Sequence, residues 1–223
     1  MIKALLYKEW IKTRWPIAVL VFLAMVIEVY MFVRLGRSVR IAGHEHLWDV
    51  IINRDQFMFY DLKYFPLFAG LTLGLFQFFP EMNQKRLKLT LHLPMKEFSL
   101  ISWMTAYGLI TLLVLFILQG LALLGGMAVY FPGEIIISAF YTTLPWFVAG
   151  ILAYLACVLV NCEPTWKRRI SNVLLTAGTI RLLFLSDLPG AYSQVFILIP
   201  VLIVLLGVVV YLSVYRFKSG LQD

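Results

Sequence analysis

Residues 81–97 read EMNQKRLKLTLHLPMKE, and this charged stretch lies between two long apolar runs. Four of its six charged residues are basic, and leucines alternate with polar residues until a proline ends the pattern. Because apolar runs flank it on both sides, the stretch is expected to form a short loop at a membrane surface. A loop that combines charge, apolar surface and a proline is a candidate docking element for a partner protein. The apolar positions are Leu87, Leu89, Leu91 and Leu93, followed by Pro94.

The composition of the whole chain is that of an integral membrane protein. Of its 223 residues, 61% are hydrophobic and 14% charged, whereas soluble domains average about 25% charged residues. The net charge of +7 arises from short basic clusters beside apolar runs. This distribution is typical of the positive-inside rule and not of a basic nucleic-acid-binding face. We therefore expect the lipid bilayer, and no nucleic acid, as a partner.

The apolar runs predict an all-α protein with six transmembrane helices in a single domain, residues 1–223, because a helix crosses the hydrocarbon core in about 20 residues. The run 98–133 carries no charge and is expected to form one long helix. Thirteen of the 19 Lys and Arg residues lie in segments assigned to the cytoplasm, and five lie in 34–63. The positive-inside rule then places both termini in the cytoplasm. The expected spans are 17–33, 64–79, 98–133, 135–160, 171–185 and 195–215.

Two segments outside the spans have a predicted role. Residues 1–15 place Ile2, Leu5, Leu6 and Trp10 at helical spacing among basic residues, which indicates an amphipathic helix in the cytoplasmic interface. Residues 34–63 are expected to form an extracytoplasmic loop containing a short amphipathic helix. Two histidines in this loop are separated by one residue and do not converge on a helix, so no metal site is expected there.

Polar and small residues inside the spans give two further hypotheses. Glu28 and Arg181 are ionisable residues within spans, where charges are costly and usually face a bundle interior or a cavity. They are expected to pair or to line an exit path, and the alternative is that each side chain reaches the interface. Gly70 and Gly74 form a GxxxG pattern, which permits close packing of helices.

This organisation resembles the membrane (permease) subunit of type-2 ABC exporters. In that family the first cytoplasmic loop has an acidic residue, a leucine-rich run and a Leu-Pro pair before the third span, and Glu81 and Pro94 stand in this order. Lys85 and Arg86 occupy the place where the family usually has Gly-Thr. The opening LLYKEW, residues 5–10, is similar to the family's usual start, in which a glutamate follows a basic residue.

The resemblance implies that 81–97 holds a coupling helix between spans two and three, which inserts into a groove on a cytoplasmic ABC ATPase. Alternation of the leucines alone indicates a strand, so the helix is an implication of the resemblance. Two ATPase subunits would bind ATP and magnesium, and this chain has no GxxxxGK[ST] motif of its own. A second membrane subunit, identical or homologous, completes the expected assembly. The docking residues are Glu81, Arg86, Leu87, Leu89, Leu91, Leu93 and Pro94.

The implied function is export of an apolar or amphipathic substrate from the cytoplasm or inner leaflet by alternating access, in the bacterial cytoplasmic membrane. The basic cluster Lys167, Arg168 and Arg169 would contact either the ATPase or anionic headgroups. The alternative function is a non-transporting membrane anchor or assembly subunit. A membrane-embedded enzyme is not favoured, because the spans offer few polar groups that would converge at one depth.

Overall fold

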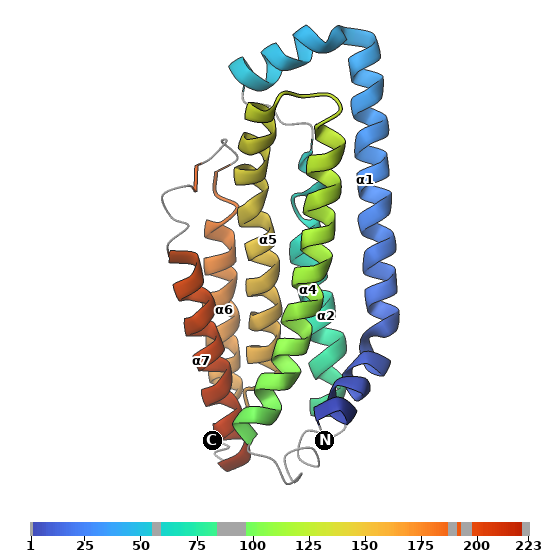
Figure 1. Ribbon diagram of the computed structural model, residues 1–223. Helices are drawn as coiled ribbons and strands as arrows, with labels where there is room; N and C mark the ends of the chain where they lie inside the picture. The colour runs from blue at the N-terminus through green and yellow to red at the C-terminus, as the bar shows by residue number, and fades with distance from the viewer. Residues whose placement is uncertain (1, 55–58, 84–96, 187–190, 193–197, 220–223) are drawn as a thin grey trace.

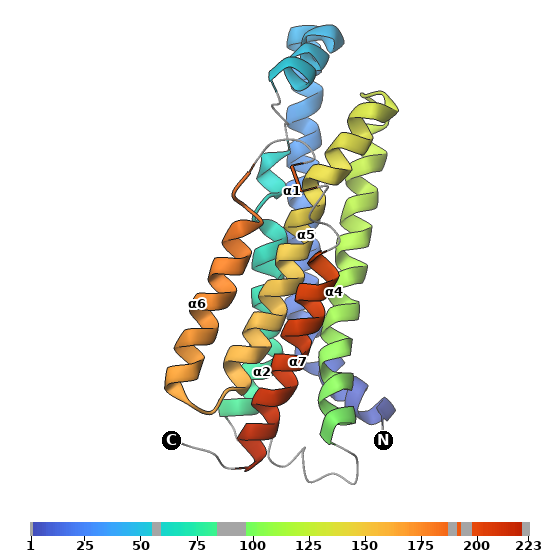
Figure 2. The ribbon, with the colours of Figure 1, turned by 90° about the vertical axis from the view of Figure 1, so that its left-hand side faces the viewer.

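A computed structural model describes residues 2–54, 59–83, 97–186, 191–192 and 198–219. Within these ranges the chain forms helices joined by turns, and no strand. The long helices form a bundle in which they run side by side, except at the two ends of α1 (Figures 1 and 2). They are α1 (Ile2–Arg54), α2 (Phe65–Asn83), α4 (Glu97–Met127), α5 (Gly133–Cys162), α6 (Trp166–Leu182) and α7 (Leu198–Ser219), with a short 3-10 helix η1 (Tyr60–Leu62) before α2.

Four helices of the described chain are long and apolar enough to cross a membrane. They are Ile2–Ile41, Tyr60–Met82, Ser99–Met127 and Gly133–Cys162. α6 has 17 residues, fewer than the roughly 20 that an upright span needs. The charge-free run 98–133 forms one helix over most of its length, and a turn at residues 128–132 separates it from α5. The protein is therefore a helical membrane protein with at least these four apolar helices.

The first and last described residues lie at the same end of the bundle, where α2 ends and α4 begins (Figure 1). We call this the termini end. α1 stands on one side of the bundle, α6 and α7 stand on the other, and α2, α4 and α5 lie between them (Figure 1). The segment 84–96, which joins α2 to α4, is thus connected to the bundle at the termini end.

α5 is the central helix of the bundle. It packs against α2, α4, α6 and α7, and 78% of its most apolar window is buried, against 22% for α1. Small residues allow this crowding: a Cβ on Gly150 would lie 2.5 Å from the carbonyl oxygen of Pro66 on α2. Close backbone approach of this kind is the usual basis of helix packing in membranes.

α1 carries its apolar side chains outward over most of its length. Phe22, Val29 and Val33 are each more than 60% exposed, although water would disfavour such a surface. Lipid tails are as apolar as these side chains, so an exposed apolar face is the expected state of a lipid-facing helix. Polar and small residues, more than hydrophobicity, then indicate which face meets the protein.

The segment 34–63, predicted to be an extracytoplasmic loop with a short amphipathic helix, contains more helix than expected, and its position outside the cytoplasm stays a prediction. Residues 34–54 are helical and belong to α1. α1 is kinked at Gly43, whose backbone has φ 78°. Glycine adopts positive φ without steric cost, and the segment after Gly43 lies across the bundle (Figure 1). The basic residues of 34–42 did not end the helix, because arginine is a good helix former.

The segment 1–15 is likewise the beginning of α1 and is continuous with it. Its first turns lie at an angle to the rest of the helix (Figure 1). Pro16 is the only proline within α1, and a proline in a helix interior removes a backbone hydrogen bond and kinks the helix. The bend brings the first turns of α1 beside the end of α2, where Lys12 contacts Glu81, and beside α4, where Thr13 contacts Tyr107.

Candidate functional site

A buried cluster of charges at the termini end joins the start of α1 to the end of α2. Glu81, the first residue of the stretch 81–97, has a side chain that is 1% exposed. Its Oε1 atom accepts contacts from Lys8 Nζ at 2.9 Å and from Lys12 Nζ at 3.0 Å. Lys8 and Lys12 are four residues apart and therefore neighbours on one face of the helix. Two cations from α1 thus hold one carboxylate of α2.

A second carboxylate completes this cluster. Glu9 is fully buried, and its Oε1 atom lies 3.0 Å from Lys12 Nζ. Lys12 therefore bridges the two glutamates. A buried carboxylate is stable only when it is paired or hydrogen-bonded, and here two lysines balance two glutamates. We call these four residues, Lys8, Glu9, Lys12 and Glu81, the Glu81 cluster.

Helical spacing places the buried groups of α1 on one face. Leu5, Glu9 and Thr13 follow at intervals of four residues, and all three are buried. The Thr13 hydroxyl bonds back to the Glu9 carbonyl at 2.8 Å and meets the Tyr107 hydroxyl of α4 at 2.9 Å. The same face of α1 therefore contacts both helices that border the segment 84–96.

Neutral hydrogen bonds continue the cluster into α4 and α5. Gln77 lies one turn before Glu81 on α2, and its Nε2 donates to the Met104 carbonyl at 2.8 Å. The Tyr154 hydroxyl of α5 donates to Gln77 Oε1 at 2.8 Å. Both side chains are fully buried. Four helices are thus joined by polar contacts at the level where the stretch 81–97 leaves the bundle.

Gly108 leaves the space that these contacts need. A Cβ at this position would collide with the Tyr154 hydroxyl and lie 2.6 Å from Gln77 Oε1. The phenol of Tyr154 therefore reaches Gln77 only because α4 has no side chain there. Packing and hydrogen bonding depend on the same small residue.

The docking residues predicted within 81–97 are only partly described. Glu81 lies in the Glu81 cluster, whereas Arg86, Leu87, Leu89, Leu91, Leu93 and Pro94 lie outside the described residues. The structure therefore fixes the point at which the stretch begins and the point, Glu97, at which α4 takes over. The start of the stretch is anchored on α1 through a buried carboxylate.

A third buried carboxylate at the termini end joins the end of α5 to α7. Glu163, which follows α5, is fully buried. Its Oε2 accepts from Ser213 Oγ at 2.6 Å and from Arg216 at 2.8 Å, both on α7. Its Oε1 accepts from Thr165 Oγ1 at 3.1 Å. We call Glu163, Thr165, Ser213 and Arg216 the Glu163 cluster.

The three basic residues predicted as a second cytoplasmic contact are divided by the structure. Lys167 and Arg168 are exposed at the start of α6. Arg169 instead donates to the Glu163 carbonyl at 2.7 Å and lies over the Trp166 ring, 5.0 Å from its centroid. Arg169 therefore stabilises the turn between α5 and α6, and the first two residues present free charge at the termini end.

The predicted pair Glu28 and Arg181 is not brought together. Glu28 lies on α1 and lines a cavity of about 520 Å³ with Arg40 and Tyr130. Arg181 lies on α6 and lines a separate groove between α2, α5 and α6. α1 and α6 stand on opposite sides of the bundle (Figure 1). Pairing is therefore not seen, whereas lining of an exit path and the alternative, that each side chain reaches the interface, both stay predictions.

Gly70 and Gly74 lie where α2 meets α5. A Cβ on Gly70 would collide with the Gly150 carbonyl oxygen, and one on Gly74 would lie 2.8 Å from the Cys157 Cβ. The pattern thus stands at a real backbone contact, and its partner on α5 includes Gly150. Any side chain at Gly70 would force the two helices apart.

Sequence reasoning missed most members of the two clusters. Glu9 and Glu163 were assigned no site role, nor were Thr13, Gln77 and Tyr154 beside the Glu81 cluster, yet all five are buried. One signal was available. Glu9 and Thr13 are four residues apart in the segment 1–15, which was interpreted as amphipathic. In a membrane helix such a polar row indicates the protein-facing side.

No protein-family model, no curated protein and no solved structure matches this chain.

Proposed function

We propose that the chain is the permease subunit of an ATP-driven ABC exporter, with residues 81–97 as the docking element for a cytoplasmic ATPase. The observation that carries the proposal is the Glu81 cluster. The first residue of the charged stretch is buried and held by two lysines of the amino-terminal helix. A loop anchored in this way moves together with the helix that anchors it.

The cluster gives force applied to the loop a path into the bundle. A push on 84–96 reaches α2 and α4 directly, because these helices end and begin at the loop. It also reaches α1 through Lys8 and Lys12 and α5 through the contact of Gln77 with Tyr154. Buried ion pairs resist separation, because breaking one leaves an uncompensated charge. Four helices would therefore respond as a unit.

The source of energy lies outside this chain in the proposal. The sequence has no phosphate-binding motif, so a partner would bind ATP and magnesium. Lys167 and Arg168, exposed at the same end of the bundle, supply a second contact to that partner. The six crossings, the cytoplasmic position of both termini and pairing with a second membrane chain are parts of the same proposal.

The test is purification of the intact chain from its host membrane through a carboxyl-terminal tag in mild detergent. We expect a protein with a GxxxxGK[ST] motif to co-purify in about one copy per membrane chain. Replacing Leu89 and Leu93 by Asp should remove this protein while the membrane chain elutes unchanged. The matched control replaces two exposed apolar residues of α1, Phe22 and Val29, by Ala and should retain it. Absence of any such ATPase would overturn the proposal in favour of the anchoring subunit.

A further inference from the structure

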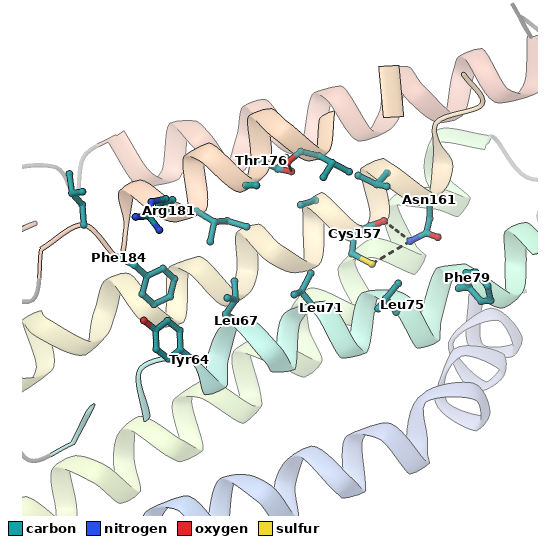
Figure 3. Close-up of a pocket in the computed structure, with 16 residues that line it drawn as sticks. Tyr64, Leu67, Leu71, Leu75, Phe79, Cys157, Asn161, Thr176, Arg181 and Phe184 are labelled. Carbon is teal, nitrogen blue, oxygen red and sulfur yellow. Dashed lines mark hydrogen bonds between the residues drawn. The ribbon is translucent and has the colours of Figure 1, made fainter. Parts of the chain in front are cut away.

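A long groove runs between α2, α5 and α6, with a volume of about 880 Å³ (Figure 3). Its α2 wall extends from Tyr64 to Phe79, about 22 Å at 1.5 Å per residue. This is most of the roughly 30 Å hydrocarbon core of a bilayer, and the volume lies in the range of sites that bind small molecules. Leucines project into it between the two ends: Leu67, Leu71 and Leu75.

The polar groups in the middle and at the termini end of the groove already have partners. Asn161 Nδ2 donates to the Cys157 carbonyl at 2.8 Å and contacts its Sγ at 3.3 Å. Thr176 Oγ1 donates to the Asn172 carbonyl at 2.7 Å. These polar side chains are already hydrogen-bonded within the protein. The rest of the lining between the two ends of the groove is apolar.

The far end of the groove is different, because it carries an unmatched cation. Arg181 is the only charged residue among those that line the groove, and it lies in the last turn of α6. Among the described residues no carboxylate pairs with it and no oxygen accepts a hydrogen bond from it. A guanidinium near the membrane is costly unless an anion accompanies it, and its planar fork fits phosphate oxygens.

Two aromatic residues line this end, and a buried lysine lies behind one of them. The rings of Tyr64 and Phe184 stack at 5.4 Å beside Arg181 (Figure 3). Lys63 Nζ lies 5.6 Å from the centroid of the Tyr64 ring. Tyrosine rings with basic residues are typical of the level at which lipid headgroups lie. The charge is thus confined to one end of the groove, at headgroup depth.

We propose that this groove is a binding site for an anionic phospholipid, with the phosphate on Arg181 and one acyl chain along the leucines of α2. The groove has a positive charge at one end and an apolar stretch of membrane dimensions beyond it. This arrangement is complementary to a phospholipid, which has an anionic headgroup and an apolar acyl chain. The site stands on its own geometry, so it does not depend on an ATPase or on transport.

The test uses the full chain extracted from vesicles of equal phosphatidylglycerol and phosphatidylcholine, with retained lipids counted by native mass spectrometry. We expect preferential retention of phosphatidylglycerol and a roughly tenfold fall in that preference in Arg181→Gln, since one charge-assisted contact is lost. Arg34→Gln is the matched control, because Arg34 already pairs with Asp61 at 3.2 Å, and it should keep the preference.

A second variant tests the part of the groove that is proposed to bind the acyl chain of the lipid. Leu71→Trp fills the groove without changing its charge, and it should lower retention of both lipids. A photoreactive benzophenone side chain at position 71 should crosslink to lipid. Unchanged preference in Arg181→Gln, an equal loss in Arg34→Gln, or crosslinking of position 71 to a second copy of the chain would each overturn the proposal.

Discussion

The two ends of the bundle differ in the burial of their charged side chains. At the termini end, Glu9, Glu81 and Glu163 are almost fully buried, and each is held by a cation from another turn or another helix. At the far end, the ion pair of Arg34 with Asp61 is 3.2 Å long and its side chains are 59% and 36% exposed. Buried pairs couple the elements that they join, whereas exposed pairs contribute little. The termini end is therefore where helices are fixed to one another.

The difference matters for the proposed function because the stretch 81–97, which we propose as the docking element, leaves the bundle at the termini end. A partner that pushes there meets four helices that are joined by polar contacts. The far end carries the cavity beside Glu28 and the charged end of the groove, and few described polar contacts cross between helices there. In the proposed function, coupling of helices at one end and freedom to rearrange at the other is the arrangement that alternating access would require.

The strongest way to break this comparison is Glu81→Gln. The substitution removes the carboxylate that both Lys8 and Lys12 contact, so we expect the free energy of unfolding to fall by about 3 kcal/mol. This lies at the lower end for a buried pair, because Lys8 is 38% exposed. Thermal unfolding in mild detergent measures the loss. A change below about 1 kcal/mol would contradict the role assigned to the cluster.

The next largest effect is expected from Glu163→Gln. This change removes the charge that Arg216 contacts but keeps an oxygen for the Ser213 hydroxyl, so we expect a loss of about 2 kcal/mol. A double-mutant cycle with Arg216→Gln isolates the pair. Additive losses in that cycle would show that the two residues do not interact in the membrane.

Tyr154→Phe tests the neutral part of the network. It removes the hydroxyl that donates to Gln77 Oε1 and leaves that oxygen buried without this donor, which costs about 1 kcal/mol. Tyr130→Phe is the control, since Tyr130 lies beside the cavity near Glu28 outside the network. Equal melting temperatures for the two variants would contradict the claim that the hydrogen bond of Tyr154 to Gln77 helps to join α5 to α2.

The smallest effect is expected at the far end. Asp61→Asn breaks the exposed pair with Arg34 and should change the free energy of unfolding by less than about 0.5 kcal/mol. The same melting experiment applies. A loss as large as that of Glu81→Gln would mean that the two ends do not differ.

Sequence patterns predicted the helices well because long charge-free runs have few alternatives in a membrane. They predicted the faces of those helices less well. In the segment 1–15, predicted to be an interfacial amphipathic helix, Ile2 and Trp10 are 38% and 50% exposed, whereas Glu9 and Thr13 are buried. Lipid and protein interior are both apolar, so hydrophobicity does not tell a lipid-facing side chain from a buried one.

The clusters were also beyond a reading of local sequence, for a different reason. Glu163 and Ser213 are 50 residues apart, and Lys12 and Glu81 are 69 apart. Spacing along a chain does not say which helices become neighbours. The prediction of a special role for Glu81 came from its place in the charged stretch, and its partners on α1 became visible only in three dimensions.

The most direct measurement of the account is the amount of ATPase retained per membrane chain when Glu81→Gln is purified through its carboxyl-terminal tag. Leu123→Ala is the matched control, because Leu123 is 1% exposed on α4 and its truncation destabilises the bundle by roughly 2–5 kcal/mol without touching a charge. The account predicts that Glu81→Gln loses most of the ATPase while Leu123→Ala retains it. Retention of the ATPase in both variants, or its loss in both, would contradict the claim that the buried carboxylate anchors the docking stretch.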